Sequence, residues 1–130
     1  QYRGGEGILQ MRLAWAQSKE GQIELIEVNS KEPNVYHDLV APEKTAFHHG
    51  GIWSDNYHAD KKFLSSSYEI ARDMGKDTNI CYFDTAEVSG NMIELIERND
   101  GILGLFGLIK KAADEWDGTK PLRTMAELTG

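Results

Sequence analysis

The chain has little cysteine, little proline and an excess of negative charge. Its single cysteine, Cys81, leaves no partner for an internal disulfide, and its place inside a strand-like apolar run favours a buried structural thiol over a reactive one. A reducing compartment suits such a chain, so the sequence predicts a cytoplasmic protein. Fourteen basic residues stand against 21 acidic ones, a net charge of −7. This balance argues against non-specific binding to nucleic acid or to anionic membranes.

Long hydrophobic runs are also missing. No stretch approaches the apolar length of a membrane span, and no signal peptide is visible. Hydrophobic residues make up 40% of the chain and charged residues 27%, which is typical of a globular domain large enough to bury a core. The sequence therefore predicts one domain over residues 1–130, with neither a membrane nor a nucleic acid as partner.

What the chain does contain is an internal repeat. The pentamer Ile23–Glu27 recurs unchanged as Ile93–Glu97. Each copy alternates carboxylates with aliphatic residues, which is the period of a β-strand, so Glu24 and Glu94 should each point to one face of a strand. Two equivalent strands with inward-pointing carboxylates can build one shared metal or acid–base site.

The remaining elements follow from periodicity and turn residues. Alternation over residues 9–16, with turn residues at 18–21, predicts a hairpin with the first pentamer. Residues 29–42 read as a connector with about two turns of helix. The second half predicts strand, helix, strand, strand, strand over residues 47–97, where a strand at 68–74 is preferred to a longer helix. Apolar residues at helical spacing after Asp100 predict a tail helix that Gly118 ends. We expect that helix to pack on the core rather than on a membrane, because its charges are of mixed sign.

Three segments together resemble the vicinal oxygen chelate superfamily: Phe47–Ile52, Cys81–Thr85 and Ile93–Glu97. That superfamily includes glyoxalase I, methylmalonyl-CoA epimerase, bleomycin-resistance proteins and extradiol dioxygenases, and the similarity is greatest to its epimerase-like branch. Residues 115–123 also resemble the C-terminal extension of members of that branch. The resemblance extends over nearly the whole chain.

The resemblance implies an α+β fold of glyoxalase-type βαβββ modules with curved mixed β-sheets. Residues 1–28 would be a partial first module, 29–46 a connector, 47–97 a complete second module and 98–130 a C-terminal helical extension. Family members hold a divalent metal through the first and last strands of each module, and those positions correspond here to Glu24, His49 and Glu94. The fourth ligand has no counterpart, because the first strand and helix of module one would precede Gln1.

Two carboxylates and one imidazole suit Zn, Mn, Fe, Co or Ni, and three ligands leave positions open for substrate. From the residues alone, the alternative is that both glutamates face solvent and that His49 is a hydrogen-bonded core residue. His48 should point to the opposite face of the strand and be structural or exposed. Three further residues are candidates for ligand binding: Trp53, Tyr82 and Arg12. The plainer alternative is a core side chain for Trp53 and a solvated one for Arg12.

Three functions remain open at this point. The first is a metal-dependent lyase, isomerase or epimerase-like enzyme for a small oxygenated metabolite or acyl thioester, with Glu94 or Glu24 as the base. The second is a non-catalytic protein that sequesters a small molecule, as resistance proteins do, in an aromatic cavity between chains that uses Trp15, Trp53 or Tyr82. The third is a remnant of a longer gene. Because an incomplete module would expose sheet edges, we expect a homodimer.

Overall fold

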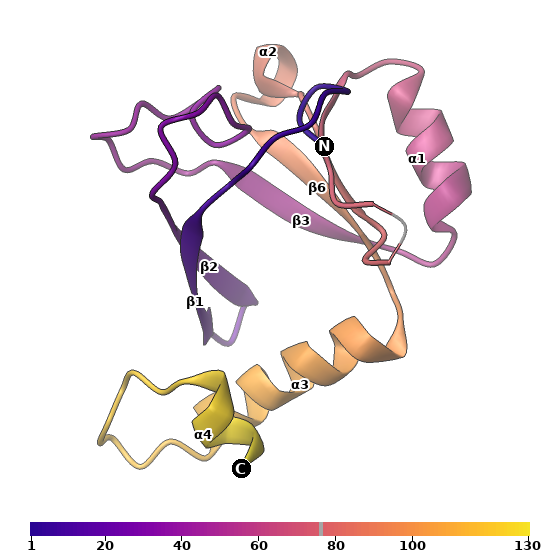
Figure 1. Cartoon of the computed structure of the whole chain (residues 1–130). Helices are drawn as coiled ribbons and strands as arrows, with labels where there is room; N and C mark the ends of the chain where they lie inside the picture. Colours follow the sequence, from indigo (N-terminus) through magenta and orange to yellow (C-terminus); the bar gives the residue numbers. More distant parts are fainter. Residues whose placement is uncertain (76) are drawn as a thin grey trace. The chain divides into compact units, whose positions relative to one another are not determined.

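The protein is an α+β protein with one mixed and one antiparallel sheet. The structure, a computed structural model, describes residues 1–75 and 77–130, and within these ranges the chain forms six strands and four helices (Figure 1). Its contacts divide the chain into two compact units. The first unit comprises residues 1–11 and 28–98, and the second comprises residues 12–27 and 99–130.

The first unit is built on a four-stranded sheet. Its elements are β3 (His49–Ser54), α1 (Tyr57–Ser65), β4 (Ile70–Asp73), β5 (Ile80–Phe83), α2 (Ala86–Ser89) and β6 (Met92–Glu97). The strand order is β3-β6-β5-β4, with β6 parallel to β3 and antiparallel to β5. The predicted order of strand, helix, strand, strand, strand is therefore confirmed. The short helix α2 was not expected, and Gly90, with φ of +75°, ends it in the left-handed conformation that glycine adopts readily.

Residue alternation along the strands gives this sheet two different faces. One face, here called the helix face, packs against α1 (Figure 1) and forms the hydrophobic core, whose buried members are Tyr57, Cys81, Phe83 and Leu95. Cys81 is fully buried, as predicted, and burial raises the pKa of its thiol. The opposite face, here called the His49 face, carries the side chains that alternate with these: Arg72, Tyr82 and Glu94, with His49, Gly51 and Trp53 of β3.

The connector does not contain the expected two turns of helix. Residues 35–40 form consecutive turns instead, in which the N–H of Val40 donates to the carbonyl of Tyr36 at 3.0 Å. The side chain of Asn34 accepts hydrogen bonds from the N–H groups of the second and third residues after it, at 3.1 Å each, as a helix N-cap does, but the segment that it caps ends after the turns at residues 35–40. Pro42 also disfavours helical geometry at the residue before it. The apolar pattern reflects burial, since Val35 and Tyr36 are 0% and 5% exposed.

The second unit holds most of the predicted hairpin and the C-terminal helices. Strands β1 (Met11–Gln17) and β2 (Gln22–Val28) form a two-stranded sheet, and their turn is closed by the N–H of Ser18 donating to the carbonyl of Gly21 at 2.8 Å. Helix α3 (Asp100–Asp114) begins after the N-cap Asn99, whose side chain accepts from the N–H of Ile102.

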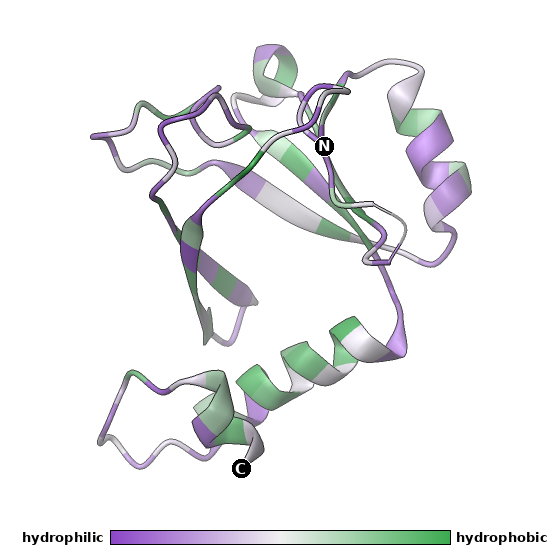
Figure 2. Cartoon of the chain, in the orientation of Figure 1, coloured by the Kyte–Doolittle hydropathy of each residue, from purple (hydrophilic) through white to green (hydrophobic). Residues whose placement is uncertain are grey.

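The tail differs from the prediction at its end. Helix α3 stops at Asp114, and Gly118, with φ of +89°, lies in the turn beyond it rather than at the helix end. A further helix, α4 (Met125–Thr129), was not predicted and begins with a capping box between Thr124 and Glu127. Hydrophobic residues follow much of α3 (Figure 2), yet no helix in the described part of the chain has the length and hydrophobicity needed to cross a membrane.

Candidate functional site

A row of residues crosses all four strands on the His49 face. Arg72 of β4 pairs with Tyr82 of β5, Tyr82 pairs with Glu94 of β6, and Glu94 pairs with Gly51 of β3. A Cβ atom at Gly51 would lie 3.5 Å from Oε2 of Glu94 and 3.2 Å from the side chain of Ile96. Glycine at position 51 therefore leaves space beside the Glu94 carboxylate that any other residue would fill.

His49 and Glu94 face each other in this space. His49 lies two residues before Gly51 on β3, so it shares its face, and its Nε2 is 3.5 Å from Oε2 of Glu94. The two side chains are only 9% and 14% exposed. The sheet thus holds an imidazole nitrogen and a carboxylate oxygen close together and largely out of water.

The hydrogen bonds of His48 decide which nitrogen of His49 carries the proton. Nε2 of His48 is 2.9 Å from the carbonyl oxygen of Val35, so it must be the N–H donor. His48 is buried, and desolvation lowers the pKa of its imidazole, which makes the ring neutral and leaves its Nδ1 as an acceptor. Nδ1 of His49 lies 3.0 Å from that acceptor and must therefore donate.

Nδ1 of His49 is thus occupied by His48, and Nε2 is the nitrogen that faces the Glu94 carboxylate. A nitrogen and a carboxylate oxygen at this distance can be bridged by a proton on the imidazole or by a metal cation. An imidazole that donates its other N–H to a neighbouring acceptor is also the usual state of a metal-ligating histidine, because that hydrogen bond fixes the tautomer and the ring orientation. His48 was predicted to be structural or exposed, and it is buried and structural.

Two predicted site residues belong to the second unit. Oε1 of Glu24 accepts a hydrogen bond from the indole N–H of Trp15 at 3.1 Å. The guanidinium group of Arg12 is exposed and bonds the carboxylate of Glu27 across the hairpin. The expectations that Glu24 is a metal ligand and that Arg12 binds substrate stay predictions.

The two predicted aromatic residues lie on the His49 face. Tyr82 is 2% exposed, and its ring meets the ring of His49 edge-on at 4.9 Å. Trp53 shares the face of His49, as its position in the strand indicated, but remains 38% exposed with the guanidinium of Arg98 5.7 Å from its ring centroid. Their roles in ligand binding stay predictions.

Sequence reasoning missed several polar residues of the first unit. Arg72 donates to the hydroxyl of Tyr36 at 3.0 Å, and that hydroxyl lies 3.4 Å from the hydroxyl of Tyr82. Separately, Arg3 binds the carboxylates of Asp38, Glu69 and Asp84. Alternation along residues 68–74 could have assigned Arg72 to one face of its strand. No sequence signal predicts that Arg72 pairs with Tyr82 or contacts Tyr36 of the connector.

The chain was also compared with known proteins. Comparisons with protein families, with curated protein sequences and with solved structures find no match.

Proposed function

We propose that His49 and Glu94 hold a divalent transition-metal ion and that the protein is a metal-dependent lyase, isomerase or epimerase-like enzyme. Its substrate would be a small oxygenated metabolite or an acyl thioester. The observation that supports this most directly is the 3.5 Å approach of His49 Nε2 to a carboxylate oxygen of Glu94 between two largely buried side chains, with His49 Nδ1 bonded to His48.

The donor set fits such an ion. One imidazole nitrogen and one carboxylate oxygen are ligands that Zn, Mn, Fe, Co and Ni accept, and they leave positions for substrate oxygens. His48 supplies the outer hydrogen bond that orients the imidazole. The resemblance described above adds Glu24 as a third ligand. A proton shared by His49 and Glu94 is the competing explanation of the same geometry.

A divalent ion bound there would polarise the oxygen atoms of a substrate and so make a neighbouring carbon acid easier to deprotonate. The residues of the chain would do the rest. Glu94 is an acceptor beside this space and can take a proton as general base. Gly51 leaves room for the substrate next to it, and the buried ring of Tyr82 keeps water away from the imidazole.

The metal content of the purified protein distinguishes a bound metal from a shared proton as the explanation of the His49–Glu94 geometry. Protein purified without chelators should contain about one divalent transition metal per chain by elemental mass spectrometry. Both Glu94→Gln and His49→Ala should remove it. Glu97→Gln is the matched control, because Glu97 belongs to the same strand but lies on the helix face. Wild-type protein that stays metal-free after loading with Zn, Mn, Ni and Co would overturn the proposal.

A non-catalytic binding function has an observation of its own. The first unit contains a cavity of about 290 Å³ whose lining includes neither His49 nor Glu94. A small molecule could therefore be bound without a metal. Saturable ligand binding that persists after chelator treatment, together with metal-free His49 and Glu94, would favour this function over the enzyme.

We further propose that the protein is a homodimer. The backbone of residues 1–3 bonds the β4 edge of the sheet, for example through the N–H of Arg3 to the carbonyl of Ala71 at 3.0 Å. In the described part of the chain no strand pairs with the outer edge of β3. An open edge of this kind favours pairing with a second copy. A monomeric mass by light scattering at micromolar concentration would contradict this proposal.

A further inference from the structure

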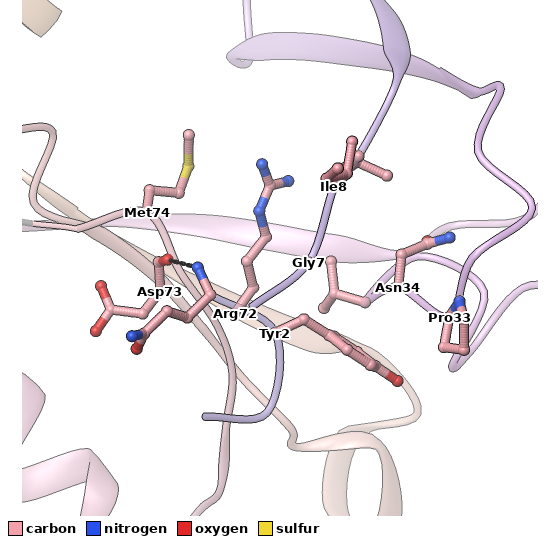
Figure 3. A pocket seen from close by; sticks show the side chains of 11 residues that line it. Tyr2, Gly7, Ile8, Pro33, Asn34, Arg72, Asp73 and Met74 are labelled. Atoms are coloured by element: carbon pink, nitrogen blue, oxygen red, sulfur yellow. Dashed lines mark hydrogen bonds between the residues drawn. The ribbon is translucent and has the colours of Figure 1, made fainter. Parts of the chain in front are cut away.

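The cavity of the first unit lies beside β4 and is lined by three segments distant in sequence. They are the N-terminal residues, residues 33–35 of the connector and the end of β4 (Figure 3). Its volume of about 290 Å³ suits a small metabolite. Ile8, Val35 and Met74 give it apolar lining, and Asn34 and Arg72 give it polar groups.

Arg72 brings a positive charge to this cavity that no carboxylate neutralises. Its Nη1 donates to the neutral hydroxyl of Tyr36 at 3.0 Å, and in the described part of the chain no acidic side chain forms an ion pair with it. The carboxylate of Asp73, which also lines the cavity, is bound by Lys61 at 2.7 Å. By contrast, Arg3 has three carboxylate partners.

A guanidinium group in a partly desolvated cavity attracts an anion more strongly than one in open water, because solvent screens the charge less there. Only one of its donors is used by Tyr36, so the planar fork can still bind two oxygen atoms at once. The side chain reaches into the cavity, where such an anion would meet it (Figure 3).

We propose that Arg72 binds the carboxylate group of a small molecule in this cavity. A single guanidinium matches the single charge of a carboxylate better than the double charge of a phosphate. Strand register sets the distance between this site and the His49–Glu94 pair. Arg72 and Glu94 lie two strands apart in the same row, which is about 10 Å at the usual strand spacing. That the carboxylate belongs to the substrate of the His49–Glu94 pair rests on the function proposed above, whereas anion binding by Arg72 does not.

The test is a titration of metal-free protein with propionate at constant ionic strength, followed by backbone amide chemical shifts. Saturable shifts should appear at cavity residues such as Asn34 and Met74. Arg72→Gln should weaken binding at least tenfold, and Arg72→Lys, which keeps the charge and loses the fork, should weaken it less. Lys62→Gln, an exposed residue of α1, removes the same charge elsewhere and should leave the affinity unchanged.

Three results would overturn the inference. The first is an unchanged affinity for propionate in Arg72→Gln. The second applies if Arg72→Gln does not fold, and is an affinity for propionate in Arg72→Lys equal to that of the wild type. The third is tighter binding of inorganic phosphate than of propionate. Repeating the titration with His49→Ala separates the two proposals. Binding that survives in this variant shows that Arg72 binds the anion without the metal site. If the wild type binds propionate but never takes up metal, only the metal proposal is contradicted. If the wild type takes up metal but does not bind propionate, only the role of Arg72 is contradicted.

Discussion

The two copies of the pentamer Ile-Glu-Leu-Ile-Glu have the same sequence and the same conformation but different surroundings. Both are strands, as β2 and β6. In the hairpin copy, the central Leu25 is 64% exposed. In the sheet copy, the equivalent Leu95 is 1% exposed. The local sequence therefore sets the strand, and the number of neighbouring elements sets the burial.

The glutamates at the second position differ in the same way. Glu24 accepts a hydrogen bond from an indole N–H, which is a donor that a carboxylate satisfies directly. Glu94 instead faces Nε2 of an imidazole at 3.5 Å, where a proton or a metal ion can join the two atoms. Two strands of identical sequence thus hold their glutamates in different environments. Glu24 accepts a hydrogen bond from an indole, whereas Glu94 lies beside an imidazole nitrogen.

The largest difference should appear when the central leucine is shortened. Leu95→Ala should lower the free energy of unfolding by about 2–5 kcal/mol, because it removes buried methyl groups and leaves a cavity in the core. Leu25→Ala should change it by no more than about 0.5 kcal/mol, because that side chain is exposed. Urea unfolding of both variants measures this. Equal losses would mean that the hairpin copy is as buried as the sheet copy.

The next difference concerns metal affinity. Glu94→Gln should weaken binding of the loaded metal by about ten- to a hundredfold, which is about 1.4–2.7 kcal/mol. Glu24→Gln should weaken it less, because an oxygen of Glu24 already accepts from Trp15. Isothermal titration with Zn on the two variants gives the ratio. A larger loss in Glu24→Gln than in Glu94→Gln would reverse the assignment of the principal carboxylate ligand.

A smaller, pH-dependent difference is expected from the ion cluster that ties the sheet of the second copy to the N-terminal segment. The hydrogen bond from Arg3 holds the pKa of Asp84 below its usual value of about 3.9. Because the folded-state pKa is depressed, this stabilisation is complete above about pH 4 and is lost as the pH falls through the lower folded value.

Asp84→Asn should therefore lower the free energy of unfolding by about 1 kcal/mol at pH 7. In strong acid the variant and the wild type should be equally stable, because the Asp84 carboxyl of the wild type is then protonated. Urea unfolding at pH 7, 4 and 2.5 tests this, with Asp114→Asn in the exposed Lys110 pair as control. A constant difference between wild type and Asp84→Asn over this range would show that the carboxylate is not stabilised by its charge.

Much of the fold was readable from the sequence because it depends on local periodicity. The hairpin, the strand containing Ile80–Phe83, helix α1 and both pentamer strands follow from alternation, turn residues and apolar spacing. The connector was predicted wrongly because its apolar residues at helical spacing are buried as a turn, which the side chain of Asn34 shapes. Apolar spacing cannot distinguish these two uses of the same residues.

The site was readable only in part. Strand parity correctly put His49 and Trp53 on one face. It was wrong to place His48 on the opposite face, because the His48 ring contacts the rings of His49 and Tyr82. The contribution of His48 could not be predicted, because it depends on a carbonyl at Val35 that lies 13 positions earlier in the chain. The same holds for Arg72 and Tyr36, whose contact joins two segments 36 positions apart. Pairings of this kind arise from tertiary structure and leave no local pattern.

The smallest difference should be at the final glutamate of the pentamer. Glu97 accepts a hydrogen bond from the side chain of Asn79 at 3.0 Å, and an amide oxygen at position 97 could accept it as well. Glu27 pairs with Arg12, and both side chains are more than half exposed. Glu97→Gln and Glu27→Gln should each change the free energy of unfolding by less than about 1 kcal/mol.

High salt should distinguish the two variants. In about 1 M NaCl, where the Debye length is about 3 Å, Glu27→Gln should no longer lower the free energy of unfolding, because the exposed Arg12–Glu27 pair is screened. The effect of Glu97→Gln should stay the same. If Glu97→Gln instead cost several kcal/mol, the difference between the copies would extend along the whole strand. With the small effect expected here, it is confined to the glutamate and leucine at the centre of the pentamer. There the sheet copy meets His49 on one face and the buried core on the other.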